Sequence, residues 1–230
     1  MKTSKIIFIS LLSTIALIIL VAMVDFRLTG RRNNGGQSDF KIKKQVLPPF
    51  KVLSINNSRN VTLVQNDSSF IEVTYLKDSI APDINFKIRE HTLIISGFEK
   101  LIHHNVSVRI NSTDSLGRMS LENSDISIEN FSTGKIVVEM DKSSIWFNQG
   151  MNQQTAYHTL DIVARNHSRV NSTKFRVDTL SIALQNSEIN LEIMARKIKG
   201  ELSDSSRIYV RQVEEISLKK DVSSHININD

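Results

Sequence analysis

Six serines recur at nearly constant intervals in the second half of the chain, and a serine hydroxyl can act as a nucleophile. Each is followed two residues later by Ile or Val, at intervals of 19, 25, 19, 19 and 18 residues, at positions Ser124, Ser143, Ser168, Ser187, Ser206 and Ser224. A nucleophilic serine needs a base within about 3 Å and a group that stabilises the oxyanion. Six equivalent copies on an apolar side offer neither, so we interpret the serines as a structural ladder and predict no catalytic residue.

The residue after each serine belongs to a second series, which points outward in strand geometry. Its members Arg169, Glu188 and Arg207 alternate in sign, so neighbours could form exposed ion pairs that contribute about 0 to 1 kcal/mol each. The alternative for this surface is a carbohydrate-processing enzyme, which needs two carboxylates about 5 to 9.5 Å apart. At about 4.8 Å per repeat, Asp125 and Glu188 would lie about 14 Å apart, which is too far.

A third series, two residues further on, also points outward and carries aromatic and amide groups. It consists of Ser127, Trp146, Asn171, Asn190, Tyr209 and Asn227. Aromatic rings beside amides can bind sugars or a protein surface. Alternatively, the loop after Asn148 buries Trp146, the one tryptophan, and the asparagines form a structural amide ladder. The candidate binding residues are Trp146, Tyr209, Asn171, Asn190, Arg169 and Arg207.

Metal and cofactor chemistry has no support in the sequence. The six histidines lack the spacing of a metal site, and neither phosphate loops nor dinucleotide fingerprints nor nucleophile elbows occur. The chain has no cysteine, which excludes a disulfide framework and a thiolate site. We therefore predict no metal, no cofactor and no enzymatic activity.

The repeats require elements that place like residues above one another. Each serine lies between two runs with period-two alternation of apolar residues, which predicts strand, turn and strand in about 19 residues. This length is too short for helical crossovers but fits one coil of a parallel β-solenoid (β-helix), whose coils stack at about 4.8 Å. Consecutive hairpins in a β-sandwich are the alternative, but they would not require a serine at the same position in every repeat. We predict solenoid repeats over residues 116–230, with a loop inserted at 148–154.

The segment before the repeats also alternates, in short runs bounded by Asn, Asp, Ser or Gly. We expect residues 46–115 to be a strand-rich opening segment that covers the first rung, because an open rung exposes unpaired backbone groups and an apolar end. The fold class is therefore all-β.

The N-terminal residues predict a membrane segment. Residues 6–24 are apolar apart from Ser10, Ser13 and Thr14, and as a helix they would reach roughly 28 Å, close to the hydrocarbon thickness of a bilayer. We interpret residues 1–24 as a signal-anchor with one transmembrane helix. A cleaved signal peptide is the alternative, although Leu20 is too large for cleavage after Ala22. Residues 25–45 are polar, basic and rich in glycine, which predicts a flexible tether.

The net charge of +5 lies in the N-terminal part. Residues 1–44 hold 8 basic and 2 acidic residues, a net +6, whereas residues 45–230 hold 21 and 22, a net −1. A nucleic-acid partner would require a basic domain, so we predict none. The excess flanks the apolar segment, where it suits anionic lipid headgroups.

Several segments resemble a known family, the GIN domain family of auto-transporter adhesin heads in Bacteroidetes. The similar segments are FKVLSI at 50–55, NVTLVQ at 60–65, IEVTY at 71–75, LIIS at 93–96 and the serine-bearing repeats. The turns here carry Asn-Ser, Lys-Ser or Ser-Ser in place of the family's Gly-Ser-Gly. The resemblance implies a β-solenoid exported beyond the inner membrane.

Together these observations predict a membrane-anchored, exported β-solenoid that acts as a non-enzymatic adhesion or interaction module of the bacterial cell envelope. Its partner would be an envelope protein or a glycan, with the membrane contacted through residues 6–24. We expect an inner-membrane anchor and a periplasmic domain, or a secreted or outer-surface protein if the signal is cleaved. The alternatives are a carbohydrate-processing enzyme on a solenoid face and a structural or signalling partner of another membrane protein.

Overall fold

The computed structural model describes residues 39–78, 86–97, 106–113, 115–148 and 156–228. The chain divides into residues 1–39 and a second unit, Phe40–Asp230, which contains all the described strands. Residues 6–24, the predicted membrane segment, lie outside the described part, as do the loop 149–155 and most of the predicted tether. No helix in the described ranges is long and apolar enough to cross a membrane.

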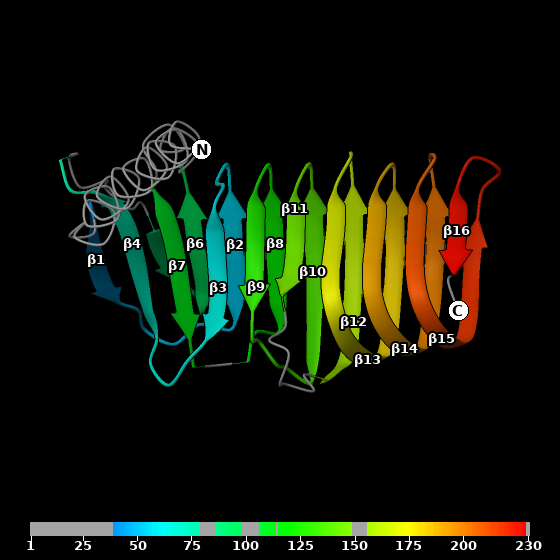
Figure 1. Cartoon of the computed structure of the whole chain (residues 1–230), viewed down its shortest axis with the longest axis horizontal. Helices are drawn as coiled ribbons and strands as arrows, with labels where there is room; N and C mark the ends of the chain where they lie inside the picture. Colours follow the sequence, from blue (N-terminus) through cyan, green and yellow to red (C-terminus); the bar gives the residue numbers. More distant parts are fainter. Residues whose placement is uncertain (1–38, 79–85, 98–105, 114, 149–155, 229–230) are drawn as a thin grey trace, which may run out of the picture. The chain divides into compact units, whose positions relative to one another are not determined.

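The described residues are all-β, with sixteen strands joined in one sheet (Figure 1). The strands are β1 (Phe40–Val46), β2 (Val52–Asn56), β3 (Val61–Gln65), β4 (Phe70–Leu76), β5 (Phe86–Arg89), β6 (Thr92–Ser96), β7 (Ser107–Ser112), β8 (Arg118–Glu122), β9 (Asp125–Glu129), β10 (Lys135–Asp141), β11 (Ser144–Asn148), β12 (Ala156–Arg165), β13 (Arg169–Gln185), β14 (Glu188–Ser203), β15 (Arg207–Lys220) and β16 (His225–Ile228).

From β8 onward, each repeat pairs in parallel with the next. The strands after the serines pair in the order β9, β11, β13, β14, β15 and β16, and the strands before the serines pair in the order β8, β10, β12, β13, β14 and β15. The three strands β13, β14 and β15 serve both series because each runs on from one serine-bearing turn to the next. Equivalent residues of consecutive repeats are therefore neighbours in the sheet.

The first strands are placed out of sequence order. β2 and β3 pair in parallel with β8 and β9 on one side and with β6 and β7 on the other. Beyond them, β4 pairs antiparallel with β7, β5 pairs antiparallel with β6, and β1 pairs antiparallel with β4. The opening segment thus contributes two parallel levels and ends in antiparallel strands.

β1 overlaps the segment 25–45 that the sequence predicted to be a tether. The prediction was wrong for residues 40–45. Phe40, Ile42 and Val46 alternate with polar residues, but the run is short, contains three lysines and is fully exposed, so it was not recognised as a strand. Its order comes from pairing with β4, in which Phe40 lies opposite Leu76 and Val46 opposite Phe70.

The core consists of residues that alternate with outward-facing ones in each strand. One buried column contains Ile126, Ile145, Val170, Ile189 and Ile208, each at most 4% exposed. Full burial of such a side chain stabilises the fold by about 1.5 to 3 kcal/mol. These columns determine which alternate residues of each strand face the core, and therefore which residues point outward.

Candidate binding face and the turns that position it

The six predicted ladder serines are buried in one column, each 6% exposed or less. The hydroxyl donates to a carbonyl of its own turn: Ser124 Oγ lies 2.7 Å from Glu122 O, and Ser143 Oγ lies 2.7 Å from Asp141 O. The hydroxyl also accepts from the backbone N–H of the serine on the preceding level, at 3.1 Å from Ser124 N to Ser143 Oγ. The same contact joins Ser143 to Ser168, Ser187 to Ser206 and Ser206 to Ser224, each at 3.2 Å.

A seventh serine extends this column and was missed in the sequence. Ser58 is fully buried, and its N–H donates to Ser124 Oγ at 3.2 Å. It escapes the serine-x-Ile/Val pattern because two residues, and not one, separate it from Val61, which lies opposite Ile126. Asn60, with φ 58°, accommodates the extra residue. The preceding Asn57, which resembles the Asn-Ser pairs downstream, was the available signal.

The residue before six of these seven serines, all except Ser224, adopts a left-handed conformation that turns the chain. Asn57, Asn123, Lys142 and Asn186 have φ between 46° and 49°, and their serines bond the carbonyl two residues upstream. Before Ser168 and Ser206 two residues are left-handed, and those serines bond the carbonyl three residues upstream. Asparagine tolerates this conformation without glycine, which explains the Asn-Ser turns.

The strands after the serines carry the two outward series in register. Asp125, Ser144, Arg169, Glu188, Arg207 and His225 are successive partners, as are Ser127, Trp146, Asn171, Asn190, Tyr209 and Asn227. All six candidate binding residues therefore lie on one outward surface, which we call the turn-side face, formed by strands β9, β11, β13, β14, β15 and β16. Their chemistry remains a prediction.

Trp146 is 46% exposed, so the alternative in which it is buried is wrong. The loop 149–155 that was expected to bury it lies outside the described residues. Trp146 lines a depression of about 290 Å³ together with Thr62, Asp125, Ser144 and Asn171. An exposed indole beside hydroxyl, carboxylate and amide groups can stack on the apolar face of a ligand while those groups form hydrogen bonds.

A second depression, of about 240 Å³, lies on the same face where the charged series passes the turns. It is lined by His167, Ser168, Arg169, Asn186, Ser187, Glu188, Ser205 and Arg207. Arg169 lies opposite Glu188, which lies opposite Arg207, yet none of the ion pairs within 4.0 Å in the described part joins them. The expected ion pairs are thus not formed, and both guanidinium groups face solvent.

Close ion pairs instead join strands before the serines. Arg118 Nη2 contacts both carboxylate oxygens of Glu139 at 2.6 and 2.7 Å, and this hydrogen bond and charge raise the pKa of Arg118. Lys135 lies 3.5 Å from Asp161, and His158 Nδ1 forms a hydrogen bond with Asp178 Oδ2 at 2.6 Å. The charges of these strands are therefore engaged with one another, unlike the two arginines of the turn-side face.

Comparison of the sequence with protein-family profiles and with curated proteins gives no match. Among solved structures, the chain is similar to a "putative adhesin" from Parabacteroides distasonis, with a TM-score of 0.52 and 13% identity over 84% of this chain and 95% of that one. It is also similar to a "putative adhesin" from Bacteroides fragilis, with a TM-score of 0.51 and 13% identity over 84% of this chain and 97% of that one. These likenesses show a shared fold.

Proposed function

We propose that the described unit is a parallel β-solenoid that acts as a non-enzymatic adhesion or interaction module of the cell envelope. Parallel pairing of consecutive repeats and the column of buried serines support the architecture. The shared fold with two solved proteins described as adhesins supports the function by analogy. The GIN domain resemblance agrees with both.

The observation that carries the functional proposal is the register of the turn-side face. It places Trp146, Asn171, Asn190 and Tyr209 at successive levels, with Arg169 and Arg207 in the adjacent column. An extended ligand along this face would meet a ring, two amides and a second ring. Because these side chains stand on paired strands, the face is ordered before a ligand arrives, which reduces the entropy lost on binding.

An enzymatic role on the same face has weaker support. Glycoside hydrolysis needs two carboxylates about 5 to 9.5 Å apart. Among the described residues that line the second depression, Glu188 is the one carboxylate, and two arginines flank it. This arrangement suits recognition of an anionic or polar ligand better than proton transfer to a glycosidic oxygen.

A glycan panel and a cross-linking screen on intact cells test the proposed role. We expect Trp146→Ala combined with Tyr209→Ala to weaken capture of the bound glycan or protein at least tenfold, because most of the aromatic contact area is lost. Ser181→Ala, on the outward side of β13 away from this face, is the control. Capture that is unchanged in the double variant would overturn the proposal, and release of reducing ends from a bound polysaccharide would favour the enzyme.

Anchoring in the inner membrane by residues 6–24, with the solenoid in the periplasm, is the second part of the proposal. The length and apolarity of that segment support it. Carbonate extraction of membranes should leave the full chain in the pellet, whereas a cleaved and secreted protein would be shortened and found in the soluble fraction. A co-purifying membrane protein would instead support the structural or signalling role.

A further inference from the structure

β1 exposes apolar side chains that its neighbours do not cover. Phe40, Ile42 and Val46 are 44%, 57% and 82% exposed and point to one side of the strand. Their partners in β4, Leu76, Thr74 and Phe70, continue the same surface. Three exposed apolar side chains within seven residues do not contribute to burying the core. Such clusters mark surfaces that bind a protein or a membrane, so this surface is a candidate binding site.

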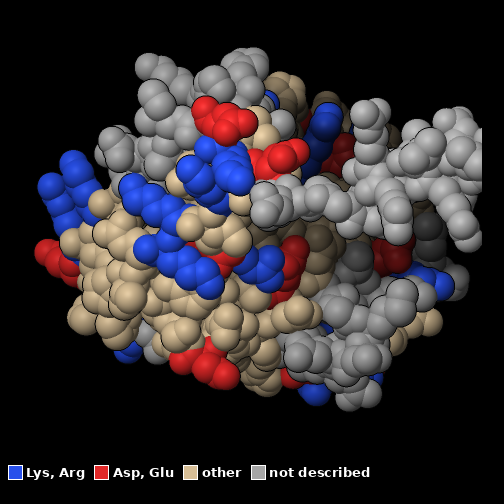
Figure 2. All heavy atoms as spheres, turned by 60° about the vertical axis from the view of Figure 1, so that its left-hand side comes forward, with Lys and Arg blue, Asp and Glu red and all other residues tan. Residues whose placement is uncertain are grey.

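Basic groups surround the apolar ones. Lys41, Lys43 and Lys44 interleave with them along β1, and Lys44 Nζ lies 3.2 Å from Glu72 and 5.0 Å from the centre of the Phe70 ring. Figure 2 shows Lys and Arg side chains gathered on this side of the molecule. Beside them is a depression of about 470 Å³ lined by Lys44, Val46, Leu47, Pro49, Ser68, Ser69, Phe70 and Thr113. Apolar residues interleaved with lysines are typical of surfaces that lie at the boundary of lipid headgroups and acyl chains.

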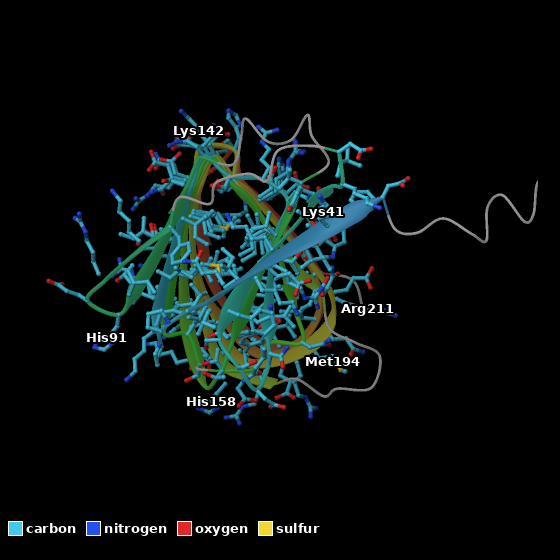
Figure 3. All side chains as sticks on the ribbon, turned by 90° about the vertical axis from the view of Figure 1, so that its left-hand side faces the viewer. Lys41, His91, Lys142, His158, Met194 and Arg211 are labelled. Carbon is cyan, nitrogen blue, oxygen red and sulfur yellow. The ribbon has the colours of Figure 1, made fainter. Side chains whose placement is uncertain are left out.

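β1 is also one of the terminal strands of the sheet. In the part of the chain that the structure describes, it pairs with β4 and with no second strand, so one of its edges is free (Figures 1 and 3). Lys41 lies near one end of β1 in the view toward this side (Figure 3). A surface that meets the free edge contacts both the apolar side and the lysines. The unpaired N–H and C=O groups there need polar partners, which the headgroup layer and its water supply.

The sequence before β1 brings a bilayer within reach. About 15 residues separate the apolar segment 6–24 from Phe40, and this length of chain reaches at most roughly 50 Å. Arg27, Arg31 and Arg32 in this tether add positive charge. Once the anchor is inserted, the tether holds β1 at high local concentration near the membrane surface.

We propose that β1 docks the folded unit on an anionic lipid bilayer through its free edge. Phe40, Ile42 and Val46 enter the boundary of headgroups and acyl chains, and Lys41 lies beside the lipid phosphates. The first level of the sheet then faces the membrane and β16 faces away. This inference rests on the proposed anchoring of the chain.

Single-cysteine labelling of the full chain tests the docking, because the protein has no native cysteine. An environment-sensitive NBD fluorophore is attached at Ile42→Cys or, as control, at Val222→Cys, which is 99% exposed in the turn before β16 at the opposite end. Each protein is reconstituted in vesicles of phosphatidylcholine with or without 30% phosphatidylglycerol. We expect a blue shift and quenching by nitroxide lipids at position 42 in anionic vesicles, weaker signals in neutral ones and neither at position 222.

The outcomes separate docking from anchoring. Protein that floats with the vesicles but whose label at position 42 is as aqueous as that at position 222 overturns docking and leaves anchoring intact. Protein that does not float overturns both. A disulfide between two copies of the unlabelled Ile42→Cys variant in anchored protein would assign the edge to a second copy instead.

A charge reversal tests the role of the lysine. Adding Lys41→Glu to Ile42→Cys should at least halve the quenching in anionic vesicles while leaving the melting temperature unchanged. Full quenching would contradict the proposed role of the charge.

Discussion

Each serine of the ladder satisfies backbone groups that no strand partner reaches. Ser143 Oγ donates to Asp141 O at 2.7 Å and accepts from Ser124 N at 3.1 Å. The spacing of the serines predicted such a column, since an inward hydroxyl at a turn must bond the backbone. Ser58 could not be found in the same way, because one extra residue shifts its phase relative to the following strand.

Replacing Ser143 with alanine should lower the free energy of unfolding by about 1 to 3 kcal/mol, because Ser124 N–H loses its acceptor in a dry turn. The melting temperature should fall by about 2 to 4 °C per kcal/mol for a unit of this size. Calorimetry measures both. Ser144→Ala, in the same turn but on the outward side, controls for strand propensity; equal effects of the two variants would argue against the ladder.

Lys142 occupies a left-handed position that asparagine fills in neighbouring turns, with φ 49°. Asn123 on the level below already donates from Nδ2 to Asn57 Oδ1 at 2.9 Å. We expect Lys142→Asn to stabilise the fold by about 0.5 to 1 kcal/mol, because asparagine tolerates this conformation better. Denaturant titration measures the change. Lys219→Asn, on a regular part of β15, should be neutral or destabilising; stabilisation by both would point to charge and not to conformation.

Asp221 organises the last turn. Its carboxylate accepts from Ser224 N at 2.8 Å, Asp204 N at 2.7 Å and Ser223 Oγ at 3.0 Å. The hydrogen bonds from Ser224 and Asp204 lower the pKa of Asp221 from 3.8 to about 2. Because the folded pKa is below the unfolded one, the stabilisation is present above pH 4 and is lost as the pH falls toward 2.

Thermal melts at pH 7 and pH 2 test this linkage. Asp221→Asn should lower the melting temperature at pH 7, and the difference from the wild type should shrink at pH 2. Glu214→Gln, an exposed carboxylate of β15, controls for the loss of one charge. A difference that stays constant between the two pH values would contradict the assignment to Asp221.

At the scale of elements, alternation predicted most of the strands, but the pairing of the first ones could not be predicted. The apolar periodicity of β2 and β3 shows that they are half-buried; it does not say that β6 and β8 are the two neighbours of β2. β1 was missed because its alternation is short and interrupted by lysines, and its sequence does not reveal that it pairs with β4. The local sequence pattern specifies which residues of a strand face the core. Which strands it pairs with depends on how the connecting segments are folded.

Gly200 is a position within β14 where the backbone requires glycine. Its φ is +139°, and a Cβ there would lie 1.8 Å from the carbonyl oxygen of Ile182 on the adjacent strand. Gly200→Ala should destabilise the fold by roughly 3 kcal/mol or more, since the clash is with backbone and cannot be relieved by a rotamer change. Gly134→Ala, where no atom lies within 4 Å, is the matched control in chemical denaturation. Equal stability of both variants would show that β14 can shift.

At the scale of the whole molecule, the repeats predicted the all-β class and the parallel contact of successive serine frames. The two outward series also followed from that spacing. Exposure of Trp146 and the absence of ion pairs at Glu188 among the described residues depend on side-chain placement, which a repeat length does not determine.

A unit built from repeated levels should tolerate the removal of a whole level. Deleting residues 187–205 joins Asn186 to Ser206, so β13 gains the register partners that β14 now has in β15. We expect cooperative unfolding with a smaller denaturant m-value, because less surface is exposed on unfolding. Deleting residues 187–196, half a level, should abolish cooperative unfolding because inward and outward residues no longer match; a folded product would argue against equivalent levels.

The position of β2 and β3 between later strands affects how the protein is made. Ser58 and Ser124 are hydrogen-bonded although they are 66 residues apart in the chain, and both edges of the β2–β3 level are completed by segments that leave the ribosome or translocon afterwards. This level therefore cannot mature in the order of synthesis. It must wait, partly open, for β6 to β9, so the slow step of folding and the period of greatest exposure to proteases and chaperones fall early in the chain's emergence.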